Sequence, residues 1–201
     1  MGDDNGFEQV LEFWFGELKD GRADDAHSER WFTKNPDFDR LLADRFEALH
    51  GRIMSGEHDA WLETPRGRLA YIIVLDQFSR NMFRDTPRMY ASDERALHAA
   101  LEGIERGMDR DLELHEQMFF YMPLMHSESL DVQNQCVELF QRLHDEAPPP
   151  LKERVADSLK YAEMHRDIVQ RFGRFPHRNA ILDRTSTDEE QHFLTQPNSA
   201  F

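Results

Sequence analysis

The chain has 201 residues and a formal net charge of −15, because 39 acidic residues outnumber 24 lysines and arginines. A chain of this length suits one domain that buries about 70% of the surface its unfolded form would expose. Its acidity repels polyphosphates and anionic lipid surfaces, so we expect no nucleic-acid partner and no membrane partner. We predict one domain over residues 1–201, with an ordered core from about 7 to 194.

A single cysteine, Cys136, excludes an internal disulfide and a thiolate-rich zinc site, and it suits a reducing cytoplasm. The first residues, MGDDNGFEQV, lack the basic and apolar segments of a signal peptide. No apolar run approaches the ~20 residues that a membrane-spanning helix needs. These features predict a cytoplasmic protein.

Hydrophobic residues recur at helical spacing along the chain, and no alternating strand pattern with hairpin turn signals is present. We therefore predict an all-α protein of seven or eight helices that pack as a single array with short connections. In chain order the predicted helices cover about 7–18, 36–55, 68–83, 93–106, 112–122, 128–145 and 151–172, with a short last helix from Thr187.

Capping residues mark the ends of these helices. Asn35 and Thr64 each precede a proline that suits the first position of a helix, and Ser92 can cap the helix that follows it. Pro123 either bends or ends its helix. The other end signals are Gly56, Ser127 or Ser129, the prolines at 148–150, Gly173 as a left-handed cap, and a capping box from Thr187 to Glu190.

The helix over 68–83 is apolar on nearly all sides, which is typical of a buried helix, yet it carries Asp76 and Arg80. At 100° per residue these two side chains share one stripe, where their spacing of four residues lets them pair. An unpaired buried charge would cost several kcal/mol, so both groups need partners. They form either a structural ion pair that locks helix packing or the polar floor of a binding pocket.

Polar side chains interrupt the apolar faces of later helices in the same way. Gln133 and His165 each lie within the apolar stripe of their own helix, while His126 and Glu128 lie just before the helix that contains Gln133. A hydrogen-bonded structural role is open to each of them, and Glu128 also suits the positive end of a helix. A shared polar site is the alternative interpretation.

The segment RFGRFPHRN, residues 171–179, is the only strongly basic stretch of this acidic chain. Arg174, His177 and Arg178 follow a helix C-terminus, where cations favour the helix dipole and can bond the last carbonyl groups. The arginines can instead form an anion clamp, because a guanidinium group presents a planar fork to carboxylate or phosphate. Both interpretations are open.

Sequence patterns of known catalytic and metal centres are largely missing. The segment HEQMF, residues 115–119, begins like a zinc-protease motif but has Phe119 in place of the second histidine. Neither a G-x-S-x-G motif nor a phosphate-binding glycine loop occurs. His126, Glu128 and His165 can form a nitrogen–oxygen metal site only if the fold brings them together. We predict no metal and no cofactor.

Five separated motifs, in order, resemble an uncharacterised and largely bacterial family, domain-of-unknown-function family 924. They are VLEFWFG, RWF, LDQFSRNMFRDTPRMYASDERAL, FFYMPLMHSESLDVQ and RFGRFPHRNAILDRTSTDEEQHFL. The resemblance runs from about Phe7 to Leu194. It implies a tetratricopeptide-like array of antiparallel helices with a concave face, and it brings no established catalytic residues. Asp183 departs from the pattern, because the resemblance predicts glycine there.

Three functions are compatible with these patterns. The first, which we favour, is a binding module that holds a small anion or a peptide in a concave polar pocket. The second is a hydrolase-like acid–base enzyme acting on a small anion, with His126 or His165 as general base. The third is a structural adaptor for protein–protein interaction, whose polar groups bond only internally. The predicted ligand-binding residues are Asp76, Arg80, His126, Glu128, Gln133, His165, Arg174, His177 and Arg178.

Overall fold

The computed structural model describes residues 6–197 and residue 199, and within these residues the protein is all-α, as predicted. The only bridge of β type in this part of the chain joins Lys19 and Arg22 in a turn. Residues 1–5, on which part of the signal-peptide prediction depends, lie outside the described residues, as do the last positions of the predicted 1–201 domain. No helix in the described part is long and apolar enough to span a membrane.

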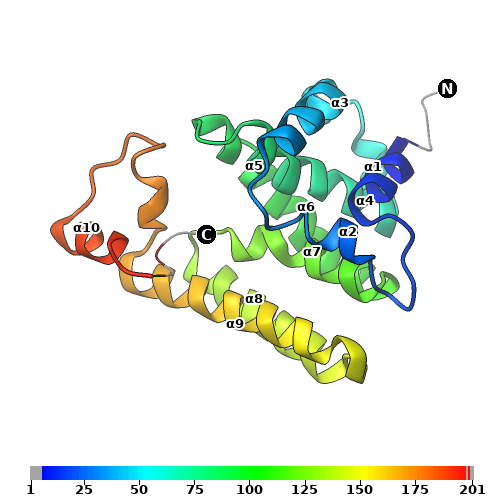
Figure 1. Ribbon diagram of the computed structural model, residues 1–201. Coiled ribbons are helices and arrows are strands. Elements are labelled where there is room, and N and C mark those ends of the chain that lie inside the picture. Colours follow the sequence, from blue (N-terminus) through cyan, green and yellow to red (C-terminus); the bar gives the residue numbers. More distant parts are fainter. Residues whose placement is uncertain (1–5, 198, 200–201) are drawn as a thin grey trace.

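The helices follow one another with short connections (Figure 1). The α-helices are α1 (Gly6–Phe15), α2 (Asp25–Ser28), α3 (Pro36–Met54), α4 (Pro65–Ile73), α5 (Ser79–Met82), α6 (Asp93–Glu105), α7 (Leu114–Met125), α8 (Leu130–Glu146), α9 (Pro149–Phe172) and α10 (Asp188–Leu194). Between them lie the π-helical segment η2 (Val74–Phe78) and the 3-10 turns η1 (Asp59–Glu63), η3 (Pro87–Tyr90), η4 (Met108–Asp111) and η5 (Pro176–Arg178).

The number of helices is larger than the sequence predicted. Because α4, η2 and α5 continue one another as a single helix, the described residues hold nine α-helices rather than seven or eight. The added element is the one-turn helix α2, which the side chain of Asp24 caps by accepting the backbone N–H of His27. Such a short element carries no hydrophobic periodicity, so the sequence pattern gave no sign of it.

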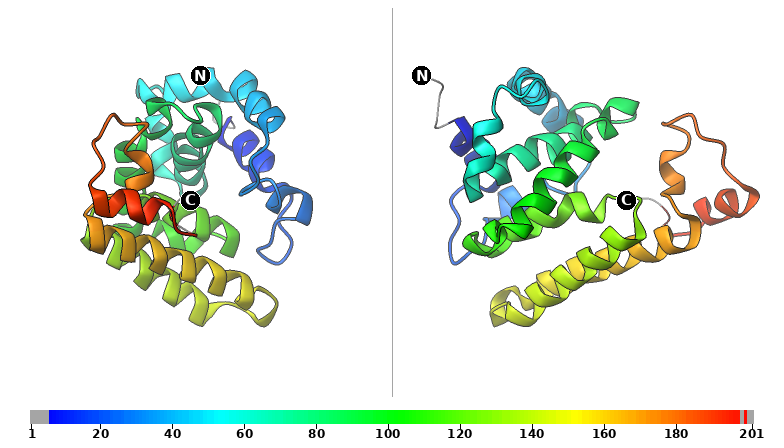
Figure 2. Two further views of the ribbon diagram at one scale, coloured as in Figure 1. Left: turned by 60° about the vertical axis from the view of Figure 1, so that its left-hand side comes forward. Right: turned by 180° about the vertical axis from the view of Figure 1, so that it is seen from behind.

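The continuous helix α4–η2–α5 lies at the centre of the fold. It contacts α1, α3, α6 and α7, and its residues from Leu69 to Val74 are buried. Helices α8 and α9 pack against each other as a long antiparallel hairpin along one side of this body (Figure 1). The chain then turns through η5 to α10, which lies at the end of the molecule opposite α1 (Figure 2).

Two apolar cores result from this arrangement. The larger core draws side chains from α1 to α9, with aromatic rings such as Trp14 and Phe119 at its centre. The smaller core lies at the end of α9 and consists of Ile168, Val169 and Phe175. The C-terminal segment therefore meets the main helical body at a seam between two cores, and polar side chains gather there.

Most predicted helix ends are confirmed. The side chains of Asn35 and Thr64 cap α3 and α4, and Gly173 ends α9 with a φ of 68°. Thr187 and Glu190 form the reciprocal capping box of α10. These signals are local, because each depends on one side chain and the backbone groups next to it.

Two predicted ends are wrong, and the choice between a bend and an end at Pro123 is decided against an end. The first helix ends at Phe15 rather than near residue 18, because Gly16 turns the chain with a φ of 65°. Helix α7 continues through Pro123 to Met125. Helix α9 begins two residues early, because prolines in the first turn sacrifice no helical hydrogen bond.

The serine caps are confirmed in position but not in bonding. Ser92 and Ser129 occupy the N-cap positions of α6 and α8, yet neither side chain bonds the first turn of its helix. The hydroxyl of Ser92 instead donates to the carbonyl oxygen of Leu75 at 2.6 Å. Residue Leu75 lies in the π-helical segment, where the widened backbone ladder leaves carbonyl groups in need of side-chain donors.

The turn around Asp183 matches the expectation that glycine belongs there. The backbone of Asp183 has a φ of 54°, in the left-handed region that favours glycine. Asp tolerates this region better than most residues. The local turn is therefore left-handed at a residue other than glycine.

Two helical glycines provide a matched test of the packing. A methyl group at Gly103 of α6 would lie 2.5 Å from Cζ of Phe120 and 2.6 Å from Cδ of Arg68, whereas one at Gly51 of α3 would meet nothing within 4 Å. We expect Gly103→Ala to lower the free energy of unfolding by about 1–3 kcal/mol through overpacking. We expect Gly51→Ala to raise it by about 0.5–1 kcal/mol through the unfolded state and helix propensity. Urea denaturation of both variants measures this, and a Gly103→Ala protein as stable as the wild type would contradict the packing.

Candidate functional site

Charged and imidazole side chains from four parts of the chain meet at the seam between the two cores. Asp76 and Arg80 come from the central helix, Asp93 from the first turn of α6, His126 from the end of α7 and Arg178 from η5. We call these five residues the central polar cluster. The predicted convergence of distant polar residues is therefore present for part of the predicted set.

Asp76 is the most buried member, with no exposed surface. Its Oδ1 lies 2.7 Å from Nδ1 of His126 and 3.0 Å from Nη1 of Arg80, and its Oδ2 accepts from the amide of Gln77 at 2.6 Å. Burial by itself raises the pKa of this carboxyl group, but Arg80 and His126 outweigh burial and hold the pKa below its ordinary range. The carboxylate is therefore ionised, and the predicted pairing with Arg80 is confirmed.

Arg80 links the central helix to α6. Its Nη1 and Nη2 donate to the two carboxylate oxygens of Asp93 at 2.9 and 3.0 Å, and Nη1 also donates to the backbone oxygen of Asp76 at 2.9 Å. Burial lowers the pKa of Arg80, but Asp76 and Asp93 overcome this and raise it. The charge of Arg80 is thus well compensated by two carboxylates.

Arg178 is compensated less well. Its Nη2 donates to the backbone oxygen of His126 at 2.8 Å, and its Nη1 makes a longer contact of 3.3 Å with Asp93, which already pairs with Arg80. The guanidinium carbon lies over the rings of Tyr90 and Phe175, at 4.7 and 4.6 Å from their centroids. Its Nε is buried and has no hydrogen-bond partner among the described residues.

The electrostatics of Arg178 reflect this poor compensation. Burial, followed by repulsion from Arg80, lowers the pKa of Arg178 despite the attraction of Asp93. The pKa of Arg80, a few ångströms away across Asp93, is shifted in the opposite direction. Arg178 is therefore a buried cation whose charge its neighbours compensate only in part.

His126 has a defined tautomer. Because an ionised carboxylate only accepts, the short contact with Asp76 places the hydrogen on Nδ1. Burial and then Arg80 lower the pKa of His126, although Asp76 opposes them, so the ring is neutral near pH 7. No described residue hydrogen-bonds Nε2 of His126, which presents a lone pair at the seam.

Two further histidines, His165 and His177, lie next to the cluster. His165 of α9 donates from Nδ1 to the backbone oxygen of Tyr161 at 2.7 Å, and its ring centroid lies 6.3 Å from that of His126. Burial lowers the pKa of His165 to about 3. Burial and then Arg178 lower the pKa of His177, in η5, to about 4. Both rings are therefore neutral near pH 7.

Three other predicted site residues, Glu128, Gln133 and Arg174, lie outside the cluster and make internal ion pairs or hydrogen bonds. Glu128 makes a two-pronged ion pair with Arg184 at 2.7 and 2.9 Å, and Arg174 makes one with Glu190 at 2.7 and 2.8 Å. The amide of Gln133 donates to carbonyl groups at the end of α7. The fold therefore gathers Asp76, Arg80, His126, His165, His177 and Arg178, and whether they bind a ligand stays a prediction.

Two residues of the site, Tyr90 and Asp93, were not predicted from the sequence. Asp93 looked like an ordinary acidic residue in the first turn of a helix, and Tyr90 lay in a predicted loop. The ring of Tyr90 covers both guanidinium groups, since it also lies 6.0 Å from Arg80. Both residues belong to a motif that carries the family resemblance, which was the only available signal.

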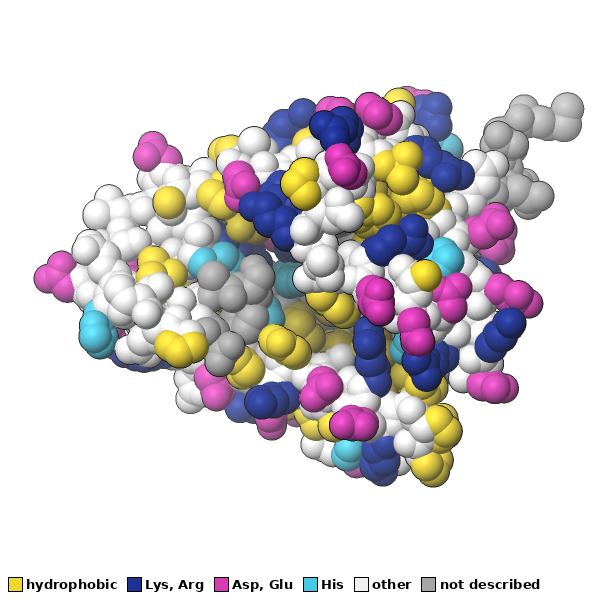
Figure 3. Space-filling model, viewed as in Figure 1, with side chains coloured by type: hydrophobic (Ala, Val, Ile, Leu, Met, Phe, Trp, Pro, Cys, Tyr) yellow, Lys and Arg dark blue, Asp and Glu magenta, His cyan; other side chains and the backbone are white. Residues whose placement is uncertain are grey.

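The edge of the cluster reaches the surface. The side chains of Arg80, Asp93 and His126 are 17%, 21% and 13% exposed. The space-filling view shows a hollow where the C-terminal segment meets the main body, with histidine and basic side chains at its margin (Figure 3). The margin of the cluster is therefore in contact with the surface, while Nε of Arg178 is buried.

The structure does not support the alternative of a metal site made of His126, Glu128 and His165. Within residues 6–197 and residue 199, no three His, Cys, Asp or Glu side chains are arranged to hold a metal ion. Arg184 and the backbone N–H of Phe175 already occupy both carboxylate oxygens of Glu128. The chemistry open to the cluster is hydrogen bonding, charge compensation and proton exchange at imidazole.

Comparison with known proteins places this chain in a family. A family model described as "Bacterial protein of unknown function (DUF924)" matches residues 10–198, so the chain belongs to the DUF924 family. A solved structure, that of the protein of unknown function ATU0120 from Agrobacterium tumefaciens, is similar with a TM-score of 0.80 and 39% sequence identity. The match covers 94% of this chain and 96% of that one. No curated protein matches.

The neutral histidines predict how stability depends on pH. His165 has a pKa of about 3 in the folded protein and about 6.5 in the unfolded chain. As the pH falls below 6.5, the unfolded chain gains a proton that the folded protein does not, so His165 lowers the free energy of unfolding by up to about 1.4 kcal/mol per pH unit.

We therefore expect His165→Gln to lose less stability than the wild type between about pH 6.5 and pH 4. Urea denaturation at a series of pH values measures the slope. The exposed His98 on α6 supplies the control, and His98→Gln should keep the wild-type slope in this range. Equal slopes for the wild type and His165→Gln would contradict the buried, neutral state of His165.

Proposed function

We propose that this DUF924 protein binds a small oxyanion, a carboxylate or a phosphate group, at the central polar cluster. The proposal depends on one observation above all: Arg178 is a buried cation with an unused Nε donor and with only a shared carboxylate as its counter-ion. A buried charge that lacks full compensation is costly, and a bound anion supplies the missing acceptor. The same requirement gives the site its specificity for an anion.

The neighbouring groups support this choice of ligand. Arg80 holds Asp93 in a two-pronged contact, so the two arginines stay close together instead of moving apart. His126 offers Nε2 at the same seam and takes up a proton when negative charge arrives. The chemistry fits one or two ligand oxygens between Arg178 and His126.

The wider setting limits the ligand to a small one. The exposed part of the cluster is narrow, with its three outermost side chains less than a quarter exposed. The net charge of −15 disfavours polyanions such as nucleic acid. A free small-molecule anion or the terminal carboxylate of a peptide satisfies both limits.

Two further features are part of this proposal. The first is a tetratricopeptide-like arrangement of the helices, with a concave face that would receive such a ligand. The second is a cytoplasmic location, which the single buried cysteine suits.

A matched pair of arginine variants tests the proposal. We expect inorganic phosphate or acetate to raise the melting temperature of the wild type, with chloride at equal ionic strength as the reference, because a ligand of the folded state stabilises it. We expect Arg178→Gln to weaken binding of the active anion about tenfold or more, through the loss of a charge-assisted hydrogen bond. Calorimetric titration measures the affinity.

Arg174→Gln is the control for this experiment, because Arg174 lies only four residues before Arg178 and its guanidinium group is already bonded to Glu190 and to the backbone oxygen of Thr185. It should lose stability but keep the affinity of the wild type. The response to phosphate against acetate tells which oxyanion the site prefers. The absence of any shift with either anion, or equal affinities in Arg178→Gln and the wild type, would contradict the proposal and leave the cluster as internal bonding of an adaptor.

One observation favours acid–base catalysis as a second candidate. Asp76 holds Nδ1–H of His126 and leaves Nε2 as a base, with Arg80 and Arg178 placed to stabilise developing negative charge. This arrangement suits hydrolysis of a small anionic ester. Turnover is the property that separates this candidate from a binding module.

Hydrolysis of p-nitrophenyl phosphate tests the second candidate, with the uncharged ester p-nitrophenyl acetate as the comparison. If the candidate is right, we expect His126→Gln to slow turnover by about 100-fold or more while the protein stays folded, because a general base contributes about that factor. Circular dichroism confirms the fold of the variant. Equal rates in the variant and the wild type would exclude His126 as the base for these esters.

A further inference from the structure

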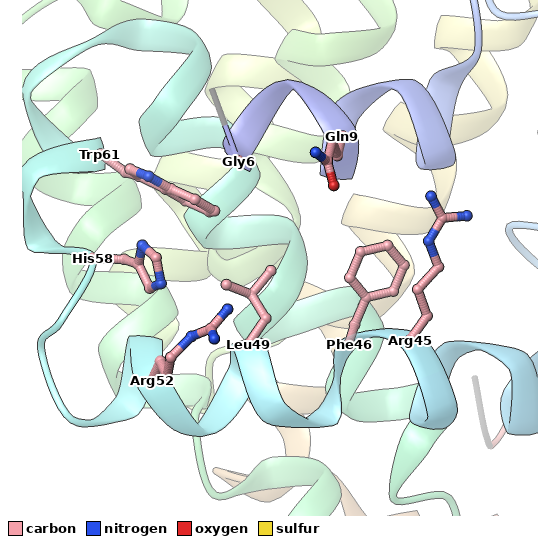
Figure 4. Close-up of a pocket in the computed structure, with 8 residues that line it drawn as sticks. All are labelled: Gly6, Gln9, Arg45, Phe46, Leu49, Arg52, His58 and Trp61. Atoms are coloured by element: carbon pink, nitrogen blue, oxygen red, sulfur yellow. The ribbon is translucent and has the colours of Figure 1, made fainter. Parts of the chain in front are cut away.

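A cavity lies between α1, α3 and η1, and it shares no residue with the central polar cluster. It has a volume of about 160 Å³, and Figure 4 shows the eight residues that line it. Gln9 comes from α1, Phe46, Leu49 and Arg52 from α3, and His58 and Trp61 from the segment around η1. None of these elements contributes to the central polar cluster.

The polar groups of this cavity are basic or neutral. Arg45, Arg52, His58 and Gln9 line it, and none of the eight lining residues is acidic. In the close-up the amide of Gln9 points from α1 toward α3, and the side chains of Arg52 and His58 lie next to each other (Figure 4). Their proximity is also evident in the pKa of His58, which burial and then Arg52 lower. A net positive cavity in a chain of net charge −15 is unusual.

The arginines of the cavity lack the partners that other arginines have. Most arginines of this chain pair with a carboxylate. In the described part of the chain, those that pair with none are Arg30, Arg45, Arg52, Arg110 and Arg154. Two of these five line the same cavity. Arg45 lies over the rings of Phe13 and Phe46, at 5.0 and 5.4 Å from their centroids, and makes no ion pair among the described residues.

The apolar side of the cavity completes its chemistry. Trp61 is 5% exposed and Phe46 4%, and together with Leu49 they form an apolar floor. The ring of His58 lies 4.7 Å from that of Trp61. A volume of about 160 Å³ is close to that of a cavity that holds a benzene ring. The cavity is too small for a drug-sized ligand, whose pockets start at about 300 Å³.

We propose that the cavity lined by Gln9, Arg52, His58 and Trp61 is a second binding site, for a small carboxylate with an aromatic or compact apolar body. The carboxylate pairs with Arg52 and accepts from Gln9, while the apolar body packs against Phe46, Leu49 and Trp61. A planar, singly charged carboxylate matches the fork of a guanidinium group. This inference is independent of the function proposed for the central polar cluster, because the two sites share no residue.

Sodium benzoate is the probe for this site, with acetate and benzyl alcohol as probes that lack the ring or the charge. We expect benzoate to bind the wild type with a dissociation constant of about 1 mM, as suits so small a ligand, and more tightly than either partial probe. Calorimetric titration measures the affinity, and quenching of tryptophan fluorescence that is absent in Trp61→Phe reports the contact with Trp61.

Arg52→Ala is the decisive variant, because Arg52 is exposed and its removal leaves the core intact. We expect it to weaken benzoate binding at least about tenfold. Arg110→Ala is the matched control, since Arg110 also lacks a carboxylate partner in the described part but does not line the cavity; it should bind as the wild type does. Absence of benzoate binding, equal binding by Arg52→Ala, or binding that is lost only in Arg178→Gln would overturn the proposal.

Discussion

The fold depends on keeping one carboxylate ionised where water does not reach it. Asp76 has no exposed surface, and three donors from Arg80, His126 and Gln77 compensate its charge. Removing one partner of such a buried pair typically costs about 3–5 kcal/mol, because the remaining charge stays desolvated. The need to satisfy Asp76 therefore fixes how the end of α7 sits against the central helix. Through Arg80 and Asp93 the same requirement extends to the start of α6.

A π-helical segment at residues Val74–Phe78 makes this arrangement possible. Its wider turn changes the direction of Asp76 relative to a regular helix, and it frees the carbonyl oxygen of Leu75, which Ser92 satisfies. Ser92 immediately precedes Asp93. The hydrogen bond from Ser92 to the carbonyl oxygen of Leu75 therefore also positions the carboxylate of Asp93, which contacts both Arg80 and Arg178. The π-helical segment and the central polar cluster are thus structurally coupled through Ser92 and Asp93. Such segments recur at functional sites in other proteins, which agrees with a binding role here.

The helices and most of their ends could be predicted from the sequence, because hydrophobic spacing and caps such as Asn35 and Thr187 are local. The pairing of Asp76 with Arg80 could be predicted as well, since four residues separate them on one helix. What could not be predicted was which distant groups would share a seam. Glu128 and Arg174 were predicted as site residues, yet Glu128 pairs with Arg184 and Arg174 pairs with Glu190. The sequence spacing of these residues gave no indication of the two ion pairs. Asp93 was missed because an acid in the first turn of a helix is usually explained by the helix dipole.

The most direct measurement of the account is a crystal structure of the protein grown or soaked with phosphate or acetate, compared with one grown without them. We expect an oxyanion at the seam, with an oxygen within hydrogen-bond distance of Nε of Arg178 and of Nε2 of His126, and with the ring of Tyr90 displaced from its position over the guanidinium group. If the anion binds elsewhere or not at all, and Tyr90 keeps its position over the guanidinium group, the claim that Arg178 binds an oxyanion is contradicted.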